Sequence, residues 1–227
     1  MQTAELKSLI DQLWTTHADA IINFIAVLCG AFFGAMIAFW LQLKAQRNQE
    51  TRDSIMASHK ILFCLLQQFN TMTLINRDLI NPYIDSPGRH IQIPATTPYN
   101  TEKNIFDFKA INYMLETHES RRILFDMHIA QENYLETLVA FNERSKMHNN
   151  EVQPRLAKIE NNGTKGITIE QSDAALGFYI NESIRNSTNS CIEIQKRTSK
   201  LLLESKTAFR NYAMEKFKTN NFTDFDI

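Results

Sequence analysis

The sequence has few glycines, prolines and cysteines, and it carries almost no net charge. Six glycines in 227 residues provide little material for the tight turns of an all-β fold. The three cysteines lie far apart, which argues against a disulfide scaffold and against a cysteine-based zinc site. Because 24 Lys and Arg residues face 25 Asp and Glu residues, the net charge of −1 predicts no binding to nucleic acid.

The motifs of common catalytic and cofactor sites are also missing from the sequence. It contains no HExxH zinc motif, no GxGxxG or GxxxxGKS/T phosphate loop, and no GxSxG nucleophile motif. No carboxylate pair, nucleophile or cluster of metal ligands stands out among the remaining residues. We therefore expect no catalytic residues, no metal, no cofactor and no enzyme activity.

Residues 20–43 form an uninterrupted apolar run without a charged side chain. At about 1.5 Å per residue, a helix of these 24 residues reaches ~36 Å, which is enough to cross a ~30 Å hydrocarbon core. The run therefore predicts a single transmembrane helix surrounded by a lipid bilayer. Residues 1–19 carry a net charge of −2, which is atypical of a cleaved signal peptide and favours an uncleaved anchor.

The charges on the two sides of the run predict its orientation. Residues 44–60 carry a net charge of +2, so the positive-inside bias places residues 44–227 in the cytoplasm and the N-terminus outside the inner (plasma) membrane. Residues 1–19 form an amphipathic leader that we expect to lie on the outer surface, with a partly frayed leader as the alternative. The apolar side chains of the leader recur at helical spacing: Leu6, Leu9, Ile10, Leu13 and Trp14.

Small residues recur at every fourth position of the apolar run, at Ala26, Gly30, Gly34 and Ala38. This extended GxxxG pattern allows two helix backbones to approach closely, so it predicts self-association of the spans and a homo-oligomer. Glycine and alanine are common in membrane spans, so a face without a partner is the alternative.

The rest of the chain predicts an elongated all-α bundle with coiled-coil-like helix pairing. Residues 44–80 contain neither glycine nor proline, and their uncharged heptad stripe includes Leu62, Leu65, Phe69 and Met72. A second long helix is expected over residues 167–218, beginning at the capping box Thr168–Gln171. We expect its uncharged stripe to pack against the first one; it includes Gly177, Ile184, Cys191, Ile194, Leu201 and Ala208.

The segments between and after these helices are less regular. Four of the five prolines fall within residues 81–100, which predicts an extended loop packed on the helices, with a short strand as an option. Residues 101–160 predict middle helices that begin after Thr101 and near Thr117, with a kink or restart caused by Pro154. A turn capped by Gly163 should follow. The tail, residues 219–227, is either a frayed terminus or a docking peptide for a partner.

Basic side chains provide one candidate binding site. The candidate contacts for an anion such as phosphate, a nucleotide or a lipid headgroup are Arg121, Arg122, Lys196, Arg197 and Lys200. The alternative is a solvated helix surface whose cations complement the helix dipole.

These patterns predict a membrane-anchored, self-associating helical protein that binds or scaffolds a cytoplasmic protein partner. The alternative is a membrane effector of a phage-defence or toxin-like system, in which the bundle senses a trigger and the spans perturb the bilayer. Both hypotheses depend on the small-residue face and on the two uncharged stripes.

Overall fold

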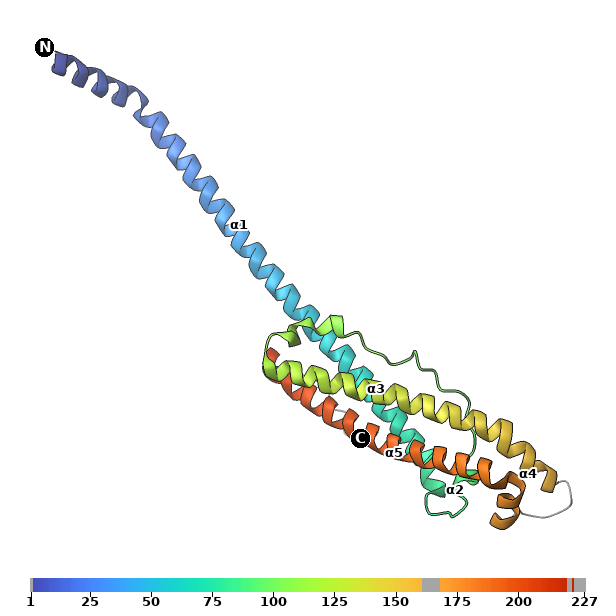
Figure 1. Ribbon diagram of the computed structural model, residues 1–227. Helices are drawn as coiled ribbons and strands as arrows, with labels where there is room; N and C mark the ends of the chain where they lie inside the picture. Colours follow the sequence, from blue (N-terminus) through green and yellow to red (C-terminus); the bar gives the residue numbers. More distant parts are fainter. Residues whose placement is uncertain (1, 161–167, 220–221, 223–227) are drawn as a thin grey trace. The chain divides into compact units, whose positions relative to one another are not determined.

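The computed structural model describes residues 2–160, 168–219 and 222, and its regular structure is helical (Figure 1). No β-strand occurs among these residues, so the predicted all-α fold class is confirmed. The chain divides into two compact units, residues 1–53 and residues 54–227. Helix α1, Gln2–Leu74, contributes residues to both units.

The first unit is helical throughout its described residues, and its apolar side chains are exposed. Every residue from Ala20 to Leu43 is exposed, with Val27 reaching 72%. The described part of the chain contains one helix that is long and apolar enough to cross a membrane, and this helix includes the run. The leader residues Leu6 and Trp14 belong to the same helix and are exposed as well.

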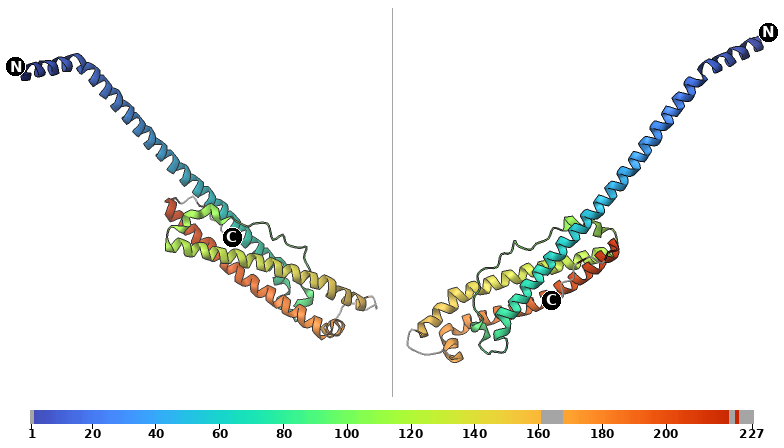
Figure 2. Two further views of the ribbon diagram at one scale, coloured as in Figure 1. Left: turned by 45° about the horizontal axis from the view of Figure 1, so that its top comes forward. Right: turned by 180° about the vertical axis from the view of Figure 1, so that it is seen from behind.

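The second unit is built around α3 (His118–Met147) and α5 (Ile169–Phe217), which lie side by side (Figures 1 and 2). Residues 54–74 of α1 complete its main core. The largest fully buried apolar side chains of this core include Leu65, Met72, Tyr134, Phe141 and Phe209. A smaller core forms where α4 (Gln153–Glu160) packs against α5.

The buried face of α1 in the second unit follows a heptad spacing but is rotated from the predicted stripe. Leu62, Leu65 and Met72 are buried, whereas Phe69 is half-buried at the edge and Gln68 takes the central position. Gln68 is accommodated because its Nε2 donates a hydrogen bond to the Asn104 carbonyl at 2.6 Å. A polar side chain can occupy a core position when its hydrogen bonds are made there.

Helix α5 shows a similar rotation of its buried face. Ile184 and Cys191 are buried, but Ile194, Leu201 and Ala208 are half-buried, and the next residue along the chain is buried instead in each case. These three buried residues are Gln195, Leu202 and Phe209. Because α5 contributes to a core shared with both α3 and α1, its buried face is wider than the seam between two helices. Gln195 bridges directly to α1, donating from Nε2 to the Met72 carbonyl at 2.9 Å.

The proline-rich region contains helical turns rather than a strand. A π-helical turn, η1 (Ile75–Ile80), and a 3₁₀ turn, η2 (Asn81–Tyr83), follow α1, and a short helix, α2 (Arg89–Gln92), lies within the predicted loop. The prediction that helix resumes after Thr101 is wrong, because the next helix is η3, Phe108–Leu115. Asn104 has a φ of 60°, a left-handed conformation that interrupts a helix.

The predicted starts of the two long helices are confirmed. The Thr117 hydroxyl accepts a hydrogen bond from the Ser120 backbone N–H at the start of α3, and the Thr168 hydroxyl does the same for Gln171 at the start of α5. Helix α3 continues into a π-helical turn, η4 (His148–Val152), directly before α4 and Pro154.

Two other predictions for this region have different outcomes. Gly177 is not a stripe position within a regular helix, because its φ of 73° breaks α5 there in a conformation that glycine adopts without steric cost. The predicted turn capped by Gly163 lies outside the described residues.

One residue of the C-terminal tail is packed on the bundle rather than frayed. Phe222 is 1% exposed, and its ring stacks on His59 with 4.6 Å between ring centroids. The Arg210 Nε donates a hydrogen bond to the Phe222 carbonyl at 3.3 Å. Burial of an aromatic ring holds the chain at this position, whereas residues 220–221 and 223–227 lie outside the described structure.

Candidate functional site

The most unusual buried group of the second unit is Arg144, on α3, which is 1% exposed. Its guanidinium donates to the Ile93 carbonyl at 2.6 Å, and to the His90 and Pro94 carbonyls at 3.2 Å each. Its Nε donates to the Thr188 hydroxyl on α5 at 2.9 Å. Within the described residues no carboxylate forms an ion pair with it, so neutral oxygen acceptors alone compensate its burial.

The charge of Arg144 persists despite this environment. Burial lowers the pKa of the guanidinium to about 10, which still leaves it protonated at neutral pH. The same site contains Cys191, whose thiol pKa burial raises to about 11, so the cysteine stays protonated. The Arg144 side chain is therefore a buried cation on α3 that links α5 to residues 90–94, which end α2 and directly follow it.

Two buried histidines, His90 and His148, form further hydrogen bonds at residues 90–94. His90 Nε2 is 2.9 Å from Asn181 Oδ1, and Asn181 Nδ2 donates to Asp173 Oδ1 at 2.9 Å. His148 Nε2 donates to the Ile91 carbonyl at 2.9 Å. Burial lowers the pKa of both histidines, and the positive charge of Arg144 acts in the same direction. Both rings are therefore neutral at pH 7.

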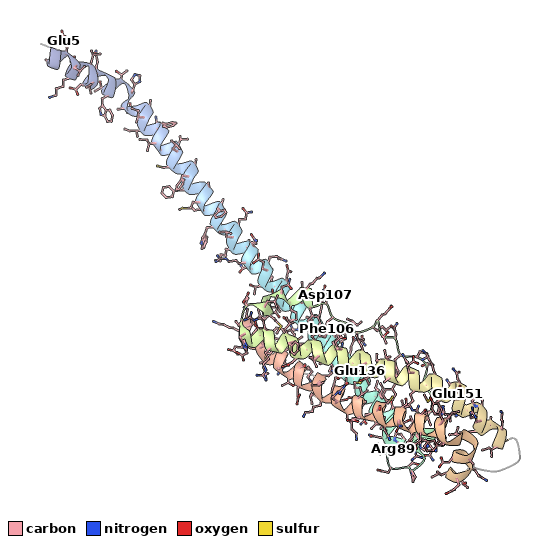
Figure 3. The ribbon with its side chains drawn as sticks, in the orientation of Figure 1. Glu5, Arg89, Phe106, Asp107, Glu136 and Glu151 are labelled. Atoms are coloured by element: carbon pink, nitrogen blue, oxygen red, sulfur yellow. The ribbon has the colours of Figure 1, made fainter. Side chains whose placement is uncertain are left out.

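Residues 84–90, which lead into residues 90–94 and share His90 with them, form one wall of a polar cleft, and α5 forms the other. The cavity has a volume of about 420 Å³. Arg89 crosses it: its Nη1 donates to the Ile84 carbonyl at 3.1 Å and its Nη2 donates to Asn189 Oδ1 on α5 at 2.9 Å. Figure 3 shows Arg89 beside α5. The cavity is lined by Ile84, Asp85, Ser86, Pro87, Arg89, His90, Arg185 and Asn189.

Two smaller cavities continue the cleft along α5. One, of about 190 Å³, shares Arg89 and Asn189 with the first cavity and adds Ile192, Glu193 and Lys196. The other, of about 290 Å³, lies between Lys196 and the η1–η2 segment and is also lined by Gln195. The Oε1 of Gln195 is buried and has no hydrogen-bond partner in the described structure. Polar groups thus line the cleft along three turns of α5.

The structure separates the five predicted anion contacts. Lys196 lines the cleft, but Arg197 is 3.4 Å from Glu136 of α3 and Lys200 is 3.9 Å from Glu204 of its own helix. Arg121 and Arg122 are exposed in the first turns of α3, where Arg121 donates to the Thr117 carbonyl. Exposed pairs of this kind contribute little to stability.

The small residues of the apolar run are open in the single chain. Ala26, Gly30, Gly34 and Ala38 are all exposed, and a Cβ added to either glycine would meet no atom within 4 Å. The stripe residues Leu62, Leu65 and Met72 instead belong to the core of the second unit, as do Cys191 and Leu201. These stripe residues pack within one chain, so they are not free to contact a second copy.

Sequence reasoning missed Arg144, His148, His90 and Arg89. A signal existed for the first two, because Arg144 and His148 continue the apolar stripe of α3 three and seven residues after Phe141. A charged residue at a core position needs hydrogen-bond or ionic partners, so the pattern predicts a buried polar contact there. The other two lie in an irregular loop, and their partners on α5 are about 90 to 100 residues away, beyond the reach of local spacing.

No group of three or more His, Cys, Asp or Glu residues in the described structure is arranged to hold a metal ion. No protein-family model, curated protein or solved structure matches this chain.

Proposed function

We propose that this chain is a single-pass membrane protein that self-associates through its span. Its cytoplasmic helical bundle binds a cytoplasmic protein partner. One observation carries the proposal. Apolar side chains of residues 20–43 are exposed without exception, whereas residues of the same types form a packed core in the second unit. A continuous apolar surface of this extent requires lipid or a protein partner to cover it.

The flanks of the run support a membrane boundary and an orientation. Lys44 Nζ lies 5.2 Å from the centre of the Trp40 ring, which combines an aromatic ring and a cation at the end of the run. The net charge of +2 over residues 44–60 favours the cytoplasmic side for everything that follows. In this orientation the leader of residues 1–19 lies outside.

The small-residue face of the run supports the proposed self-association. The open positions around Gly30 and Gly34 leave room for the backbone of a second helix on the face that also carries Ala26. Larger side chains cover the rest of the run, including Leu28 and Phe32. The small-residue face is therefore the part of the helix surface where two backbones approach most closely.

An exposed aromatic pair supports binding of a protein partner. Phe178 and Tyr179 are 85% and 81% exposed, directly after the break in α5 at Gly177. Exposed aromatic side chains are frequent anchors of protein interfaces because they bury a large area with few rotatable bonds. The partner that fits them offers an apolar pocket.

Disulfide crosslinking tests the membrane and self-association parts together. In a Cys29→Ser background, we expect Ala26→Cys to form crosslinked dimers in native membranes, and Leu28→Cys, about 200° around the helix, to form few. Cys64 and Cys191 should not interfere, because burial raises the pKa of each thiol to about 11. Adding Gly34→Ile should reduce the dimer while the helix content of the bundle stays unchanged.

Equal crosslinking at both positions, or release of the chain from membranes by alkaline carbonate, would contradict this part of the proposal. A reporter fused after Ile227 should be active in the cytoplasm. Collapse of the membrane potential on overexpression would instead favour the membrane effector.

The partner part has its own experiment. Proteins that co-purify with the intact chain should be lost from a Phe178→Ser variant and retained by Phe125→Ser, a matched change at a 60% exposed position of α3. Retention by both variants would exclude the aromatic pair as the binding surface.

A further inference from the structure

We propose that the cleft between residues 84–90 and α5 binds a phosphate monoester. The inference does not depend on the membrane anchor or on a protein partner. Two guanidinium groups, Arg89 and Arg185, line one cavity of about 420 Å³ together with His90 and Asn189. Guanidinium groups bind phosphate oxygens through paired charge-assisted hydrogen bonds.

The hydrogen-bond inventory leaves donors available for such a ligand. Arg89 uses two of its five N–H groups, toward the Ile84 carbonyl and Asn189. The Nε of Arg185 is buried without a hydrogen-bond partner in the described structure; its nearest carboxylate oxygen, on Glu182, is 3.8 Å away. A buried donor without an acceptor is costly, and a bound anion would satisfy it.

Hydrogen bonds around His90 hold one end of this wall of the cleft in place before any ligand binds. Arg144 fixes the His90, Ile93 and Pro94 carbonyls, and His148 fixes the Ile91 carbonyl. Asn181 holds the His90 ring. A wall fastened by buried hydrogen bonds loses little conformational entropy on binding, which favours affinity.

The size and lining of the cavity favour an organic phosphate over a bare anion. Its volume falls within the range of about 300–1,000 Å³ that is typical of small-molecule sites. Asp85 is the carboxylate of the lining, and the Ser86 hydroxyl lies beside it in the chain. A carboxylate repels a phosphate group but accepts hydrogen bonds from hydroxyl groups, so it suits the organic part of a phosphate monoester.

A titration of the full chain in phosphatidylcholine nanodiscs tests the proposal, with AMP as the probe and adenosine as its counterpart without phosphate. We expect AMP to bind at millimolar concentrations or below, with affinity that falls as salt is added, and adenosine not to bind. Arg185→Gln should weaken AMP binding at least about tenfold. Arg121→Gln, which removes an exposed charge from α3, should leave it unchanged.

The choice of Arg185 separates ligand binding from folding, because the Nε of Arg185 forms no hydrogen bond within the described chain and its 3.8 Å ion pair with Glu182 is exposed and contributes little to stability. Absence of AMP binding, or equal affinity of the wild type, Arg185→Gln and Arg89→Gln chains, would overturn the proposal. Nanodiscs that contain phosphatidate distinguish two sources of the same chemistry. Unchanged AMP affinity there assigns the site to a soluble phosphate monoester, and reduced affinity assigns it to the lipid headgroup.

Discussion

Two stretches of the same helix, residues 20–43 and residues 54–74 of α1, differ in what surrounds their apolar side chains. In the first, every side chain is exposed and none is charged. In the second, a stripe that includes Leu65 and Met72 is buried, and the one charged residue, Lys60, lies off the stripe. Periodicity thus separates a helix that packs against protein on one face from one that is apolar around its whole circumference and is long enough to cross a membrane.

The comparison also concerns polar groups. Residues 54–74 bring Ser58 and Gln68 into the core, where each is hydrogen-bonded, to Tyr113 and to the Asn104 carbonyl respectively. Such partners come from other segments of a folded unit. The apolar run contains Asn23 and Gln42 as its only side-chain amides, both near its ends. The middle of the run therefore has no side-chain amide that needs a hydrogen-bond partner from another segment.

A matched pair of substitutions provides the largest expected contrast between the two stretches. Leu65→Ala should lower the free energy of unfolding of the second unit by about 2–5 kcal/mol, because it opens a cavity in the core around a fully buried side chain. Leu28→Ala, at a 52% exposed position, should leave that free energy unchanged. Urea unfolding in detergent, followed by circular dichroism, measures both. A similar loss in the two variants would mean that residues 20–43 also pack against the bundle.

The sequence allowed prediction of the helices of this fold more completely than of its contacts. The apolar run, the cap at Thr117 and the capping box at Thr168 are local patterns, and the structure has helices there. At some positions the buried faces of α1 and α5 are shifted by one residue from the predicted stripes, as where Gln68 and Gln195 are buried through hydrogen bonds to distant segments. Heptad counting treats such residues as surface.

The cleft could not be predicted for the same reason. Arg89 and Asn189 are 100 residues apart, and their hydrogen bond depends on how an irregular loop crosses α5. Arg144 carried a detectable signal as a cation in an apolar stripe, but its acceptors are backbone carbonyls, which have no sequence signature.

A substitution at Arg144 sharpens the comparison by testing polar rather than apolar stabilisation of the second unit. Arg144→Met should lower the free energy of unfolding by about 2 kcal/mol, because buried carbonyls of His90, Ile93 and Pro94 lose their donor. Part of that loss is offset, since the buried charge is also removed. Arg121→Met, an exposed matched control on α3, should have no effect. A stability equal to that of the wild type would show that these carbonyls do not need Arg144.

The smallest expected effect is a dependence of the bundle's stability on pH, which the apolar run should not share. Burial lowers the pKa of His90 and His148 below the ordinary value of 6.5. Well above pH 6.5 both rings are neutral in the folded and the unfolded chain, so they contribute no pH dependence there. As the pH falls through 6.5, the unfolded chain takes up protons first, so the free energy of unfolding decreases until the folded pKa values are reached.

Urea unfolding at several pH values between about 7.5 and 5.5 measures this slope. His148→Gln removes one of the two groups and should reduce the slope, whatever its effect on stability at neutral pH. Membrane association should stay constant over the same range, because residues 20–43 contain no Asp, Glu, His, Lys or Arg. A free energy of unfolding that does not change with pH would mean that protonated histidines are tolerated beside Arg144. The second unit would then be as independent of pH as the apolar run.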